Sequence, residues 1–178
     1  SKNMRKDIRR INTNNIFNLN RIASNDSVEG GASLTYGTEF TKSKKTGKEI
    51  INISLANTLK NKEDKNMPLN SSLGQKTSDI FGSINFSPNN IWSLGYEFAQ
   101  DSDLSDTNFQ IIKSEMSINN FVTTFEYLNE NNTSSSNSYL TNKTSYQFNK
   151  SSIIAFETRE NKKTKITEFY NLLYQYRN

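Results

Sequence analysis

The chain has 178 residues, with 22 Lys and Arg against 18 Asp and Glu, and therefore a net charge of +4. It contains neither Cys nor His, which excludes disulfides, thiolate metal sites, thiol nucleophiles and His-dependent hydrolase chemistry for this chain. No apolar run approaches the roughly 20 residues of a membrane-spanning helix. Only 33% of the residues are hydrophobic, but aromatic residues make up 11% and are spread along the sequence, which favours an ordered chain over a disordered one.

Residues 1–27 are predicted to form a lead-in segment or loop that precedes the strands. The first six residues include three basic ones, Lys2, Arg5 and Lys6, but no apolar stretch follows them, so they are not a secretory signal. The chain is therefore either cytosolic or cut from a longer protein. Its Ser start and its abrupt end at Asn178 favour a fragment.

Apolar and polar side chains then alternate with a period of two, which is typical of β-strands with two different faces. One example is the segment around Trp92, where Leu94, Tyr96 and Phe98 oppose polar neighbours such as Glu97. In the first half of the chain the alternation predicts four strands, at residues 31–41, 49–57, 78–87 and 91–100. Phe81 interrupts the alternation of the third.

The second half of the chain continues in the same way. Its predicted strands cover residues 107–118, 121–129, 139–148, 152–160 and 164–177. In the first of these, the apolar side changes between Ile111 and Met116, which predicts a β-bulge. The sequence thus predicts about nine strands, and no helical period of comparable strength occurs.

The connections between these strands alternate in length. Short turns are predicted at 44–48, 88–90, 119–120 and 149–151, and longer polar loops at 58–77, 101–106, 130–138 and 161–163. Alternating short turns and long loops are typical of the hairpins of outer-membrane barrels.

Three features favour a membrane barrel over a soluble β-sandwich. The strands are long enough to cross a bilayer at a tilt. Charged strand residues mostly lie on the side opposite the aromatic residues. Aromatic residues gather near strand ends, as a girdle at the membrane interface requires; these are Phe86, Trp92, Tyr139, Phe148 and Tyr176. We therefore expect an all-β, antiparallel up-and-down transmembrane β-barrel, of which residues 28–178 supply about nine strands.

In such a barrel the polar side of each strand faces a wet lumen. The candidate lumen-facing residues are Thr35, Glu39, Asn52, Glu97, Lys143, Arg159 and Gln175. The alternative for each is an ordinary solvated strand residue without a specific role.

Other polar clusters carry weaker signals. Arg21 with Glu29 either fixes a loop at the lumen entrance or forms a structural ion pair, which we favour. The acidic loop containing Asp101, Asp103 and Asp106 lacks EF-hand spacing, so a solvated loop is favoured over a Ca²⁺ site. The basic stretches lack any nucleic-acid-binding signature, and no nucleophile elbow or phosphate loop occurs. We therefore expect no catalytic residue, no cofactor, no metal and no nucleic-acid partner.

Several short motifs resemble the LptD family (OstA or Imp), the lipopolysaccharide-assembly proteins of the outer membrane. The sequence N-I-F-N-L-N-R at 15–21 matches the family's N-[IL]-F-x-L-N-R segment, and V-E-G-G at 28–31 and L-T-Y-G at 34–37 follow as in the family. The S-D-I-F-G at 78–82, the strand pair 85–98 with Pro88 in its turn, and Y-Q-Y-R-N at 174–178 continue the match. The cluster of Arg21, Glu29, Gly30 and Gly31 is its most specific part.

The resemblance covers about residues 14–178 and has two departures. Residues 55–60 lack the Gly-Gln-x-Tyr of many relatives, and residues 61–75 are unusually rich in Lys and Asn. It implies the C-terminal part of a barrel in the outer membrane of a Gram-negative bacterium, acting as a lipopolysaccharide translocon and not an enzyme. It further implies a lateral gate, an LptE-like lipoprotein plug, an LptA-like periplasmic bridge, surrounding outer-membrane lipid and insertion by the barrel-assembly machinery. A porin-like solute channel and a soluble β-sandwich binding module remain the alternatives.

Overall fold

A computed structural model of the chain describes residues 10–19, 21–22, 29–68, 71–132 and 135–176. The other residues lie outside this description, including the basic Lys2, Arg5, Lys6 and Arg9, Val28 of the V-E-G-G motif and the terminal Arg177 and Asn178. Among the described residues, no helix has both the length and the apolar character needed to span a membrane.

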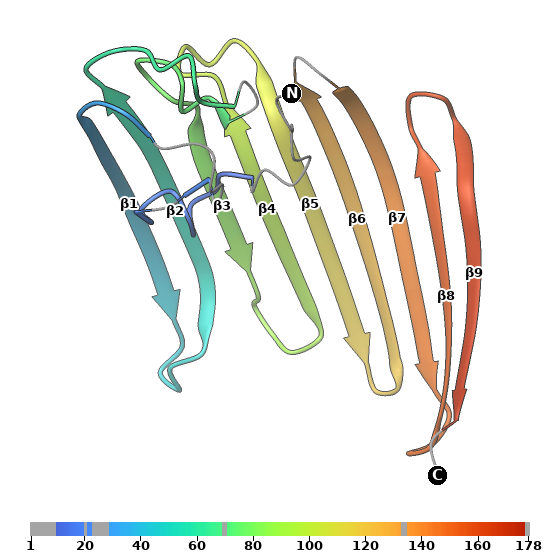
Figure 1. Ribbon diagram of the computed structural model, residues 1–178. Helices are drawn as coiled ribbons and strands as arrows, with labels where there is room; N and C mark the ends of the chain where they lie inside the picture. The colour runs from blue at the N-terminus through green and yellow to red at the C-terminus, as the bar shows by residue number, and fades with distance from the viewer. Residues whose placement is uncertain (1–9, 20, 23–28, 69–70, 133–134, 177–178) are drawn as a thin grey trace.

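The described residues form one nine-stranded antiparallel sheet (Figure 1). Each strand pairs with its neighbours in sequence, so the order in space is β1 to β9. The predicted all-β, up-and-down antiparallel architecture is confirmed. The strands are β1 (Ser33–Ser43), β2 (Glu49–Lys60), β3 (Ile80–Phe86), β4 (Trp92–Gln100), β5 (Thr107–Ile118), β6 (Phe121–Asn132), β7 (Ser135–Gln147), β8 (Ser152–Asn161) and β9 (Ile166–Tyr176).

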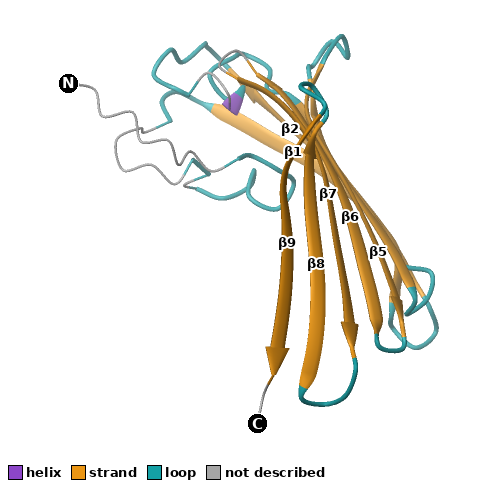
Figure 2. Cartoon of the chain, turned by 90° about the vertical axis from the view of Figure 1, so that its right-hand side faces the viewer, coloured by secondary structure: helices purple, strands orange, loops and turns teal. Residues whose placement is uncertain are grey.

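The sheet is curved and open. Strands β1 and β9 form its two edges and do not pair with each other. Figure 2 shows the sheet bent into a trough, with the segment before β1 on its concave side. We call residues 10–22 the strap, of which residue 20 lies outside the described residues.

The strand register separates two faces of different chemistry. On the concave side, which we call the inner face, one cross-strand row runs through Glu39, Ser54, Ser83, Glu97, Ile111, Leu128 and Tyr139. The next row, on the opposite outer face, runs through Phe40, Ile53, Ile84, Tyr96, Ile112, Tyr127 and Leu140. The period of two in the sequence therefore produces an entirely apolar or aromatic row beside a mostly polar one.

The buried core lies between the strap and the inner face. Three isoleucines of the strap, together with Met67 and Leu73 of the β2–β3 loop, pack with apolar residues of the strands. The core consists of Ile11, Ile16, Ile22, Ala56, Met67, Leu73, Phe81, Ala99 and Phe109, with Ile111 and Leu128 packed against it. Phe81 breaks the sequence alternation because it belongs to this core and not to the outer face.

The bulge predicted between Ile111 and Met116 is wrong. The β5–β6 register is continuous from Phe109 to Ile118. Ile111 points inward to the core and Met116 outward, so both fit a regular strand. The register of β4 against β5 shifts only at its end, between Ala99 and Gln100.

The loop predicted at 130–138 is also wrong. Strand β6 continues to Asn132 and β7 begins at Ser135, with Asn129 paired to Ser138 and Glu130 to Asn137. Polar Asn and Ser residues conceal this extension in the sequence, because backbone pairing and not side-chain burial continues the hairpin.

Candidate functional site

The strap is built from Asn-based turns. The Asn12 side-chain oxygen accepts hydrogen bonds from the backbone N–H groups of Asn14 (3.0 Å) and Asn15 (3.2 Å). The Asn15 amide donates to the carbonyl oxygen of Arg10 at 2.8 Å, and its own oxygen accepts from the Asn12 N–H at 3.0 Å. Asn side chains often replace backbone partners in this way, which explains the Asn-rich sequence before β1.

Arg21 fixes the C-terminal end of the strap in a buried polar cluster. Its Nε donates to Glu29 at 2.8 Å, and its Nη2 donates to the second carboxylate oxygen at 3.1 Å. Its Nη1 donates to Thr35 and Thr58, both at 2.9 Å, and to the Ile16 carbonyl at 3.1 Å. The planar guanidinium thus joins strap, β1 and β2, which a Lys side chain cannot do with one nitrogen.

Lys60 completes this cluster from the end of β2. Its Nζ lies 3.0 Å from Glu29, and its side chain is 1% exposed. Glu29 therefore forms ion pairs with both Arg21 and Lys60, and its own side chain is 17% exposed. Buried ion pairs of this kind depend on keeping every partner, because removing one leaves a charge without compensation.

Gly30 and Gly31 connect this cluster to the β2–β3 loop. The Gly30 N–H donates to Asp64 at 3.0 Å, and this bond, with another from the Asn66 N–H, lowers the pKa of Asp64. Gly31 has φ +83°, and a Cβ there would lie 3.0 Å from the Asn61 side-chain oxygen. The left-handed backbone at residue 31 therefore favours glycine.

The strap contacts the sheet at three further places. The Arg10 guanidinium lies 3.8 Å from the centre of the Phe109 ring and forms an ion pair with Glu130 at 3.1 Å. The hydroxyls of Thr13 and Ser83 are 3.1 Å apart. Phe17 lies over Gly37, where a Cβ would come within 2.9 Å of the Phe17 ring. These contacts span β1 to β6.

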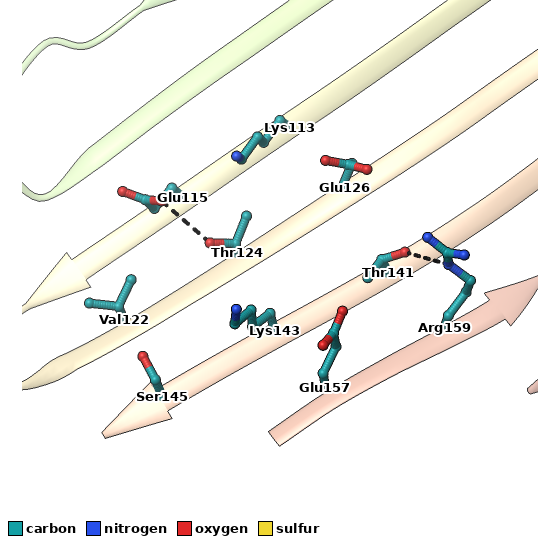
Figure 3. Close-up of a pocket in the computed structure, with 10 residues that line it drawn as sticks. All are labelled: Lys113, Glu115, Val122, Thr124, Glu126, Thr141, Lys143, Ser145, Glu157 and Arg159. Atoms are coloured by element: carbon teal, nitrogen blue, oxygen red, sulfur yellow. Dashed lines mark hydrogen bonds between the residues drawn. The ribbon is translucent and has the colours of Figure 1, made fainter. Parts of the chain in front are cut away.

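Beyond the strap, the inner face of β5–β8 carries a group of six charged residues that we call the charged patch (Figure 3). They are Lys113, Glu115, Glu126, Lys143, Glu157 and Arg159. Together with Val122, Thr124, Thr141 and Ser145 they line a depression of about 430 Å³. No hydrogen bond or ion pair between described residues connects the strap to these six side chains.

Arg159 lies at the end of this depression nearest the β8–β9 turn, beside two aromatic rings. Its guanidinium lies 5.2 Å from the Tyr139 ring centre and 5.6 Å from that of Phe169. Tyr139 was predicted for an outer aromatic girdle, and this prediction is wrong, because the residue pairs with Leu128 on the inner face. The sequence gives no signal for these contacts, since three separate strands supply them.

All seven candidate lumen residues lie on the inner face by strand register. Lys143 and Arg159 belong to the charged patch, and the Asn52 amide donates to Glu39 at 2.5 Å. Thr35 accepts the hydrogen bond from Arg21. Glu97 lies between Ser83 and Ile111, and Gln175 lies beside Ile153, away from the others.

The three loop aspartates do not converge on a common point. Asp101 accepts a hydrogen bond from the Asn108 amide at 2.5 Å. Asp103 accepts one from the Ser105 N–H, which lowers the pKa of Asp103. No group of three or more acidic side chains within the described residues is arranged to hold a metal ion.

Sequence comparison provides the family. A search of the curated proteins finds no match to the chain. The family model of LptD, described as LPS transport system D, matches residues 9–166. This match includes the strap, the Arg21 cluster and strands β1 to β8, so the chain belongs to the LptD family of lipopolysaccharide transport proteins.

Proposed function

We propose that this chain forms part of the wall of an outer-membrane β-barrel that delivers lipopolysaccharide to the outer leaflet in a Gram-negative bacterium. Lipopolysaccharide is amphipathic, so its sugars need a wet path while its acyl chains need lipid. A barrel with a polar inside and an apolar outside supplies both environments.

The observation that carries this proposal is the uncovered apolar outer face. Within the described residues there is one sheet, and no second sheet packs on that face as in a β-sandwich. Large apolar side chains there are exposed by 51% at Phe125, 69% at Tyr170 and 73% at Leu172. Exposure on this scale across several strands is typical of a surface that meets lipid or another apolar partner.

The inner face supports the same assignment. It carries charged and hydroxyl side chains over β5–β8 and the polar Arg21 cluster over β1–β2. We propose that this face borders an aqueous lumen, with the seven candidate residues from Thr35 to Gln175 among its lining, and that Arg21, Glu29, Gly30 and Gly31 have a structural role there.

Membership in the family supports finer features, which are part of the same proposal. Edge strands such as β1 and β9 must pair with further strands in a membrane, because unpaired backbone groups are too costly in lipid. We propose that the complete barrel has a lateral gate, an LptE-like plug and an LptA-like periplasmic bridge, and that the barrel-assembly machinery inserts it. We propose a transport role without enzymatic activity.

Depletion of the protein in its native bacterium tests this function. We expect newly made lipopolysaccharide to stop reaching the cell surface, measured by pulse labelling followed by surface-specific detection. The abundance of an unrelated outer-membrane porin serves as a control for general envelope damage. Unchanged delivery together with reduced uptake of small solutes would instead identify a channel and contradict the proposal.

A further inference from the structure

We infer that the charged patch on β5–β8 is a saccharide subsite, which binds the sugar hydroxyls of a glycolipid on its way through the barrel. The inference rests on the proposed function and adds a location and a ligand chemistry to it. It is based on the arrangement of the six charged side chains on the inner face, which the strap does not contact through hydrogen bonds or ion pairs between described residues.

The strand register places the six charges in two adjacent rows. The first row runs Lys113, Glu126, Thr141 and Arg159, and the second runs Glu115, Thr124, Lys143 and Glu157. Neighbouring strands lie about 4.8 Å apart, so donors and acceptors alternate at short intervals in both rows. Sugar hydroxyls both donate and accept hydrogen bonds, and such an alternating surface suits them.

The charges of the patch are balanced but unpaired. Three cations and three carboxylates sum to zero, and none of the six forms an ion pair with another described residue. The hydrogen bonds they make are long, at 3.4 Å from Thr124 to Glu115 and 3.5 Å from Arg159 to Thr141. Their hydrogen-bonding capacity is therefore available to a ligand.

The balance of charge also selects among ligands. A phosphate group would meet a carboxylate beside every cation, so the patch lacks the concentrated positive charge that phosphate sites use. A polypeptide partner would need apolar contact area, because the centres of protein interfaces are depleted in charged residues. Val122 is the only aliphatic hydrocarbon side chain among the lining residues. A polyhydroxylated chain fits these conditions best.

One donor of the patch is held in a fixed position. The rings of Tyr139 and Phe169 lie 5.2 and 5.6 Å from the Arg159 guanidinium, which limits its freedom. The remaining cations, Lys113 and Lys143, are exposed and keep their hydration. Because only the Arg159 donor is oriented, we expect the patch to bind sugar weakly. Weak binding suits a transport path, since the glycolipid must be able to leave the site.

Site-specific photo-crosslinking in the full-length protein tests this subsite. A photoreactive residue replaces Thr124, which lines the patch, or Phe125, which lies next to it and is exposed on the outer face. We expect the Thr124 probe to capture lipopolysaccharide in cells. With purified protein, delipidated core oligosaccharide should compete with this capture, while lipid A without core sugars should not. The Phe125 probe should show no such competition by sugar.

Charge removal adds a second measurement. The double variant Glu126→Ala/Lys143→Ala should lower capture at Thr124 about fivefold, which corresponds to roughly one lost hydrogen bond. The matched variant Lys44→Ala/Glu49→Ala removes the same charges from the exposed β1–β2 hairpin and should leave capture unchanged. Heat-resistant migration of both variants establishes that they fold.

The outcomes separate this inference from the proposed function. If lipopolysaccharide delivery depends on the protein but the Thr124 probe captures only polypeptide, or lipid A as well as whole lipopolysaccharide, the saccharide subsite is wrong and the transport function stands. If delivery does not depend on the protein, the proposed function itself fails.

Discussion

At the scale of single residues, two arginines hold the strap in different ways. Arg21 is 8% exposed and bonds to side chains of Glu29, Thr35 and Thr58. Arg10 lies at the surface, where its ion pair with Glu130 has side-chain exposures of 44% and 22%. Because the Arg21 cluster is buried, its disruption costs much stability, whereas solvent screens the exposed Arg10–Glu130 pair and makes its loss cheap.

This difference predicts the effect of removing each charge. Arg21→Met should lower the free energy of unfolding by about 3 kcal/mol, because it leaves Glu29 partly buried and removes hydrogen bonds from both threonines. Arg10→Met should cost less than about 1 kcal/mol. Urea unfolding of the full-length protein in lipid vesicles measures both. Equal losses for the two variants would show that the Arg21 cluster does not anchor the strap.

At the scale of strands, the alternation of side chains predicted most of the sheet. All nine strands occur where the period of two indicated, because apolar residues recur on the outer side of each strand even though polar residues lie between some of them. The inner face was harder to predict, since the strap turns part of it into a packed core. Phe81 and Ile111 seemed irregular for this reason, and only the folded strap explains them.

Contacts between distant segments limited the prediction of the candidate site. The alternation was enough to assign Lys143 and Arg159 to the polar side of their strands. It gave no indication that Tyr139 and Phe169 flank Arg159, or that Lys60 joins Glu29, because these partners are brought together by register and loop packing. The sequence paired Arg21 with Glu29, but it gave no indication that Thr35 and Thr58 also accept hydrogen bonds from Arg21.

The two faces predict opposite responses to a new charge on β4. Leu94→Arg places a cation on the apolar outer face, beside Phe86, and should cost about 2 kcal/mol in a membrane. Ser93→Arg places the same charge next to Glu115 on the inner face and should be tolerated. The fraction of heat-resistant barrel in outer-membrane preparations measures both. Normal assembly of Leu94→Arg, or failure of both variants, would contradict the assigned faces.

At the scale of the whole molecule, the sheet is a curved wall with different surroundings on its two sides. The strap and the Arg21 cluster contact the concave side of β1–β6, and the charged patch on β5–β8 lies outside these contacts. The convex side exposes rows of apolar and aromatic side chains. Transport as proposed requires lipid on the convex side of the sheet and water on the concave side.

Spin labels at two adjacent residues of β6 test that claim most directly. Phe125 lies on the outer face and Glu126 on the inner face, and each is replaced in turn by a labelled cysteine in the membrane-inserted protein. We expect the label at residue 125 to be relaxed mainly by oxygen dissolved in the lipid, and the label at 126 mainly by a water-soluble nickel complex. Shielding of residue 125 from both reagents, or its relaxation by the nickel complex, would contradict the account.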